Sequence, residues 1–149
     1  MAQRPKHLKK SNEFPKLSKK DHLVTSDRDP YYNCIAFAAG ITDKKYWPNW
    51  HPDYTWLDSV PRAATLDAFI KFYESFGYSG PSDESFVDGI EKVAIFTDKS
   101  GTPTHAAKQI GPNKWTSKLG DSYDIEHKRD AVSDGIYGSV AYYVARPKT

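Results

Sequence analysis

Three short segments in the second half of the chain constrain the fold more than any other feature of the sequence. The first, Lys92–Thr97, has Val-Ala-Ile-Phe at its centre and is followed by the turn sequence Asp-Lys-Ser-Gly. The next two, Thr104–Ile110 and Lys114–Lys118, are joined through Gly-Pro-Asn. Because connections this short join antiparallel neighbours, the sequence predicts an antiparallel meander, with residues 139–145 as a final strand.

Two helices are predicted ahead of the meander. Residues 33–40 predict a short buried helix that Asn33 caps and Gly40 ends. Residues 63–76 predict a longer helix, because their apolar residues repeat at the spacing of one buried face. The prolines of the aromatic loop over 43–61 argue against a regular element there. This order predicts an α+β fold, with helices packed on one side of an antiparallel sheet.

The charge distribution divides the chain into a tail and one domain. Residues 1–20 hold seven Lys or Arg and one Glu, which predicts a basic, solvated tail before a single domain over 21–149. The tail has no Trp or Tyr that could stack on bases, so we expect no nucleic-acid partner. A nucleic-acid binder that uses the tail is the alternative.

The single cysteine excludes an intrachain disulfide and favours a reducing compartment. The N-terminus lacks the apolar run of a secretory signal, and no stretch approaches the roughly 18 apolar residues of a membrane span. We therefore expect a cytoplasmic protein without a membrane partner, with a secreted effector as the open alternative. The net charge of +2 indicates no particular partner, and the sequence predicts no oligomeric state.

Cys34 is the candidate nucleophile. A lone cysteine among alanines is by default a small buried hydrophobe. Cys34, however, lies in the first turn of a predicted helix, where unpaired backbone N–H groups and the helix dipole favour an anion. Such positions lower a thiol pKa to roughly 3.5–7.5, against about 8.5 for a free cysteine. The position therefore favours a thiolate.

A thiolate nucleophile needs a base and a group that orients the base. His105 is the one histidine of five inside a predicted meander strand, and the small residues after it leave room for a facing helix. We expect Asp124 to orient it, because a carboxylate stabilises an imidazolium better than a hydroxyl does. Ser117 on the neighbouring strand is the alternative third member. Two competing interpretations remain. His105 could be a structural histidine, and Asp124 could be a helix cap or a turn residue.

The remaining candidate residues surround this pair. Tyr32 or Asn33 could add an oxyanion or substrate contact beside the backbone N–H of Cys34. The aromatic side chains of the loop could stack on a sugar or grip a peptide, or they could instead cover the helix over 63–76; they are Trp47, Trp50, Tyr54 and Trp56. Cys34, His105, Asp124 and His127 offer ligand types for zinc, but no CxxC, HxH or HExxH spacing is present. We expect no metal and no cofactor.

Several motifs together resemble an uncharacterised bacterial family over roughly residues 30–146. They are YNCIAFAAG at 32–40, the WP-rich loop around Trp47-Pro48, EKVAIF at 91–96, THAAKQ at 104–109, WTSKLG at 115–120, DIEH at 124–127 and YG at 137–138. Their order is similar to that of the papain-like superfamily, which includes NlpC-type cell-wall amidases. The resemblance implies a papain-like fold with Cys34 and His105 as the catalytic pair. The NlpC-type third position falls on Ser117, which is unusual for that role.

These observations predict a cysteine hydrolase that acts on an amide of a peptide, a cell-wall peptide or a side chain. The sulfur would attack the acyl carbon, His105 would protonate the leaving amine, and water or another amine would resolve the thioester. Hydrolysis, deamidation and transamidation share these steps. The alternative is a catalytically inactive binding module of papain-like fold that uses the aromatic loop over 46–56.

Overall fold

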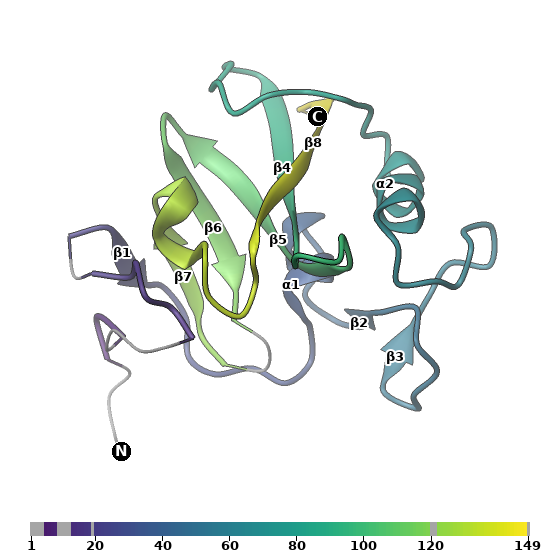
Figure 1. The fold of residues 1–149 in the computed structure, drawn as a ribbon, viewed down its shortest axis with the longest axis horizontal. Coiled ribbons are helices and arrows are strands. Elements are labelled where there is room, and N and C mark those ends of the chain that lie inside the picture. Colours follow the sequence, from purple (N-terminus) through teal and green to yellow (C-terminus); the bar gives the residue numbers. More distant parts are fainter. Residues whose placement is uncertain (1–4, 9–12, 19, 120–121, 149) are drawn as a thin grey trace.

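The computed structural model describes residues 5–8, 13–18, 20–119 and 122–148. Its main feature is a six-stranded sheet in the order β1-β7-β6-β5-β4-β8, in which every neighbouring pair is antiparallel (Figure 1). The strands are β1 (His22–Val24), β4 (Ile90–Thr97), β5 (Pro103–Gly111), β6 (Lys114–Lys118), β7 (Asp124–His127) and β8 (Ser139–Pro147). A separate parallel pair joins β2 (Lys45–Tyr46) to β3 (Tyr54–Thr55).

The helices are short. They are α1 (Cys34–Ala38), α2 (Leu66–Glu74) and the 3₁₀ helix η1 (Arg129–Val132). The helix α1 ends because Gly40 adopts a φ of +84° and the N–H of Ile41 turns back to the carbonyl of Ala36. The predicted end of the helix at Gly40 therefore leaves α1 with only five residues, of which Cys34 is the first.

The predicted α+β, papain-like (NlpC-type) fold is wrong. Within the described residues the chain forms eight strands and two α-helices, of five and nine residues. An α+β fold needs a layer of helices against its sheet, and α1 is barely more than one turn. The protein is a small β-rich domain built on an antiparallel sheet.

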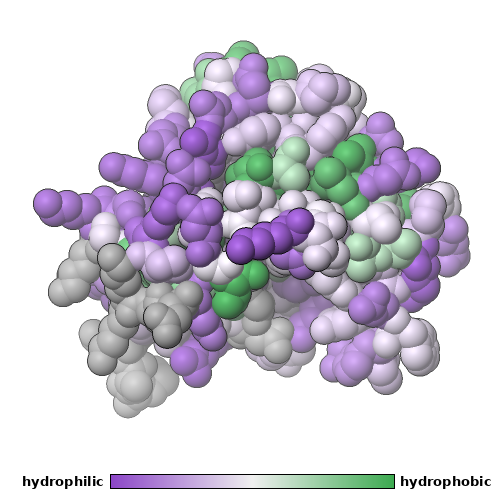
Figure 2. Space-filling view, viewed as in Figure 1, coloured by the Kyte–Doolittle hydropathy of each residue, from purple (hydrophilic) through white to green (hydrophobic). Residues whose placement is uncertain are grey.

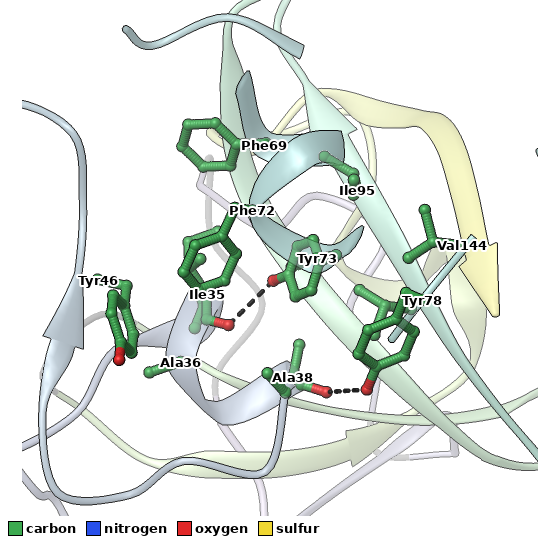
Figure 3. Packing of buried hydrophobic residues seen from close by; sticks show 14 of the residues in the cluster. Ile35, Ala36, Ala38, Tyr46, Phe69, Phe72, Tyr73, Tyr78, Ile95 and Val144 are labelled. Atoms are coloured by element: carbon green, nitrogen blue, oxygen red, sulfur yellow. Dashed lines mark hydrogen bonds between the residues drawn. The ribbon is translucent and has the colours of Figure 1, made fainter. Parts of the chain in front are cut away.

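Alternation along the strands divides the core into two parts. Val93 and Ile95 of β4 pack with α1 and α2 on one side of the sheet, which we call the helix face. Ala94 and Phe96 pack on the other side, the back face. Figure 3 shows how the helix face is closed: the Tyr73 hydroxyl donates to the carbonyl of Ile35 at 2.9 Å. The second bond drawn there, from Tyr78 to the carbonyl of Ala38, also ties α1 down.

Part of the segment predicted as a solvated tail packs on the back face. Leu17 is fully buried and Phe14 is 8% exposed. Both belong to the cluster around Phe96 and Trp115. Residues 1–4, 9–12 and 19 of the predicted tail lie outside the described residues. The described residues 13–17 are thus part of the folded domain.

The surface seen in Figure 2 is mostly hydrophilic, with hydrophobic residues in small separate groups. Across the described ranges, no helix combines the length and the apolar character needed to cross a membrane.

Candidate ligand pocket at Cys34

Cys34 is the first residue of α1, and Asn33 before it is the N-cap. The Asn33 side-chain oxygen accepts from the N–H groups of Ala36 and Tyr46, both at 3.1 Å. Its amide nitrogen donates to the carbonyl of Tyr46 at 2.8 Å. The predicted cap is confirmed, and the same side chain ties α1 to β2. These three bonds occupy the amide that sequence analysis offers as an oxyanion or substrate contact.

A hollow of about 310 Å³ opens beside Cys34. Three aromatic rings, a lysine, a hydroxyl, Asn33 and the thiol surround it; the lining residues are Asn33, Cys34, Lys45, Trp47, Tyr54, Thr104 and Tyr137. Ligand pockets span roughly 300–1,000 Å³, so this one suits a small group. Cys34 itself is 7% exposed.

The Cys34 thiol is not activated in this arrangement. Burial raises the pKa of Cys34 to about 11, and nearby backbone groups oppose that rise only in part. The position of Cys34 at a helix start predicts a lowered thiol pKa, but α1 has only five residues and its dipole is correspondingly small. The thiol is therefore protonated at neutral pH.

The imidazole of His105 lies on the back face, away from the thiol. In β5 its neighbour Ala106 packs with Cys34 on the helix face, so alternation sends His105 to the other side. There its ring stacks on Tyr137, with centroids 3.9 Å apart, and meets Phe96 edge-on at 5.3 Å. Among the described residues neither ring nitrogen has a hydrogen-bond partner. Burial lowers the pKa of His105 well below its usual value, so the ring is neutral.

The structure places Asp124 with Tyr32 and not with His105. The Tyr32 hydroxyl donates to Asp124 at 2.6 Å, and both residues are buried. The Lys118 ammonium lies 3.8 Å from Asp124 and 4.4 Å from the centre of the Tyr32 ring. Burial and this hydrogen bond raise the pKa of Tyr32. Tyr32, predicted as a substrate contact, thus belongs to a buried cluster with Asp124 and Lys118.

Ser117, the alternative third member, bonds to a different histidine. Its hydroxyl lies 2.8 Å from Nε2 of His127, and Nδ1 of that ring lies 2.7 Å from the carbonyl of Lys128. A carbonyl only accepts, so the proton belongs on Nδ1 and Nε2 accepts from Ser117. Burial lowers the pKa of His127 to about 4. Both side chains are buried on the back face, where they form a structural pair.

The four side chains weighed as zinc ligands do not converge. Cys34 and Asp124 belong to the helix face, whereas His105 and His127 belong to the back face. Throughout the described part of the chain, no group of three or more His, Cys, Asp or Glu is arranged to hold a metal ion.

The three predicted tryptophans have three different environments. Trp56 stacks on Phe72 at 5.1 Å and belongs to the core. Trp47 meets Phe69 edge-on at 5.3 Å and also lines the hollow. Trp50 is 81% exposed and does not line it. The alternative interpretation, that these rings cover the second helix, therefore holds for Trp47 and Trp56.

Three pocket residues were not predicted from the sequence: Lys45, Thr104 and Tyr137. For Thr104 a signal was present, because alternation puts it on the same face as Ala106 and opposite His105. Lys45 reaches the hollow from a segment without a recognisable pattern. Tyr137 belongs to the YG motif at 137–138, which indicates no chemistry by itself.

One family of known proteins matches the chain, and its description names no chemistry. A family model described as a domain of unknown function, DUF7689, matches residues 23–145. No curated protein and no solved structure matches the chain. The matched range includes every residue that lines the hollow. The chain therefore belongs to the DUF7689 family.

Proposed function

We propose that the protein is a binding module that takes a small amide-containing ligand, such as part of a peptide, into the Cys34 pocket. The observation that carries this proposal is the convergence of Trp47, Tyr54 and Tyr137 with Lys45 around one hollow. Aromatic faces pack against planar amide groups and apolar side chains. A lysine ammonium has three donors, so Lys45 can donate to a carbonyl oxygen of the ligand. The Thr104 hydroxyl, whose proton goes to the Tyr137 carbonyl, can accept from an amide N–H.

Binding fits the site better than catalysis does, because the thiol lacks a base. A nucleophilic cysteine needs a lowered pKa or a partner that takes its proton. The pKa of Cys34 is instead raised to about 11 by burial. The His105 ring faces the opposite side of the sheet.

Protection of Cys34 from iodoacetamide tests the binding proposal. N-acetylphenylalaninamide should slow alkylation of the native protein more than N-acetylalaninamide does. Tyr54→Ala removes a wall of the hollow and should reduce the protection. Trp50→Ala is the matched control, because it removes an exposed ring of the same loop. Equal rates with and without millimolar probe would contradict the proposal, as would equal losses in the two variants.

A cysteine hydrolase is the second candidate, and the state of His105 favours it. Leaving a buried polar atom without a partner costs roughly 1–3 kcal/mol, and His105 has two such atoms. Tyr137 stacks on this ring and also lines the Cys34 pocket. Hydrolysis would require β5 to turn His105 toward the helix face. His105 would then take the thiol proton and the sulfur would attack the amide carbon. The C–N bond would break as His105 returns its proton to the leaving amine, and water would hydrolyse the thioester to the acid and the free thiol.

The pH dependence of alkylation separates the two candidates. For the binding module, the alkylation rate should rise with pH as expected for a thiol with a pKa of about 11. A hydrolase predicts fast labelling well below pH 8, which His105→Ala should abolish. Cleavage of amide substrates that persists in Cys34→Ser would exclude the hydrolase at this site.

A further inference from the structure

The loop that carries Tyr137 is held by the N-terminal segment. The N–H of Ile136 donates to the carbonyl of Glu13 at 3.0 Å. The Lys16 ammonium pairs with Asp134 at 2.5 Å. These two contacts fix residues 134–136 from outside, on the back face of the sheet.

Gly135 fits the segment closely. A Cβ at this position would collide with the carbonyl oxygen of Glu13 and would lie 2.9 Å from the Pro15 ring. The backbone of Gly135 does not need a positive φ. An alanine here would therefore disturb the contact with residues 13–15 without straining its own backbone.

Tyr137 connects this contact to the Cys34 pocket. One side of its ring stacks on His105 at 3.9 Å, and Phe14 meets it with centroids 5.5 Å apart. Its carbonyl accepts from the Thr104 hydroxyl. The same residue, with Thr104 and Cys34, lines the hollow. A displacement of residues 13–16 would therefore alter the pocket wall through the Tyr137 ring.

We propose that residues 13–17 form a strap that fixes Tyr137 in the wall of the Cys34 pocket, so that displacing the strap opens the pocket to ligand. The inference rests on the proposed function, because it names the regulation of that same site. The fully buried Leu17 anchors one end of the strap. Next to Leu17, the side chains of Lys16 and Asp134 are each about half exposed, so a competing partner can reach that contact.

The alkylation rate of Cys34 by iodoacetamide tests the strap. Gly135→Ala should raise the rate several-fold at fixed pH. Gly111→Ala is the matched control, because its added Cβ would meet only the Lys114 side chain, at 3.5 Å. An unchanged or slower rate in Gly135→Ala overturns the proposal.

Exchanging the charges of the Lys16–Asp134 pair provides a second test that does not depend on whether Gly135→Ala folds. Lys16→Glu and Asp134→Lys should each raise the alkylation rate, and the double variant should restore it. Single variants at the wild-type rate overturn the strap. This readout uses no ligand, so a failed strap leaves protection by N-acetylphenylalaninamide intact. A failed binding proposal instead shows as no protection in the wild type.

Discussion

The environment of His105 is unusual for a histidine. The residue is fully buried, and within the described chain neither ring nitrogen has a hydrogen-bond partner. Its contacts are ring contacts, with Tyr137 on one side and Phe96 at the edge. The environment is thus that of an aromatic core residue, which explains why the neutral form prevails.

We therefore expect His105→Phe to stabilise the fold, by about 1 kcal/mol or more. The change removes two unpartnered polar atoms and keeps a flat ring against Tyr137. His127→Phe is the control, since that ring bonds to Ser117 and to the Lys128 carbonyl and should lose stability. Urea unfolding measures both. A destabilised His105→Phe would show that the nitrogens are needed, which would favour the hydrolase.

The buried histidines also predict a pH dependence. Burial lowers the folded-state pKa of His127 to about 4, against 6.5 for the ordinary group. Below pH 6.5 the unfolded chain takes up a proton that the folded chain refuses, so stability falls until about pH 4 and then levels off. The loss from His127 is at most about 3 kcal/mol. His105 acts in the same direction. Urea unfolding between pH 7 and pH 4 measures the slope, which His127→Gln should reduce.

At the scale of elements, sequence patterns predicted those strands and helices that are determined by residues close together in the sequence. The strand Lys114–Lys118 is confirmed at both ends, and α2 lies inside its predicted range. β1 and β7 were missed, because they have only three and four residues and pair across about a hundred positions. Asp-Ile-Glu-His contains one apolar residue, so no alternation could identify it.

The helix α1 depends on its cap more than α2 does. Asn33 holds both the first turn of α1 and the backbone of Tyr46, whereas Thr65 caps only α2. Losing an N-cap costs about 0.5–2 kcal/mol. We expect Asn33→Ala to cost about 2 kcal/mol or more and Thr65→Ala about 1 kcal/mol, measured by urea unfolding. Cys34 alkylation should accelerate in the first variant only. Equal costs would mean that the link to β2 contributes nothing.

At the scale of the whole molecule, the predicted site differs from the observed one because the sequence does not show on which face of the sheet α1 packs. Alternation along β5 correctly puts His105 and Ala107 on one face, but it cannot say on which face α1 packs. The helix packs over Ala106, so Cys34 joins Thr104 and Tyr137 in the pocket. That choice depends on contacts between residues about 70 positions apart, which a single sequence does not display.

The core on the back face also depends on residues far apart in the sequence, because the N-terminal segment packs against it. Leu17 is fully buried there and packs in the cluster with Phe96 and Trp115. Removing such a side chain costs about 2–5 kcal/mol, through lost transfer free energy and the cavity that remains. Leu17→Ala should therefore lose this much in urea unfolding. Leu23→Ala, on the 44% exposed side chain of β1, is the control and should change little. A Leu17→Ala variant as stable as the wild type would return the segment to the solvated tail that its charge predicts.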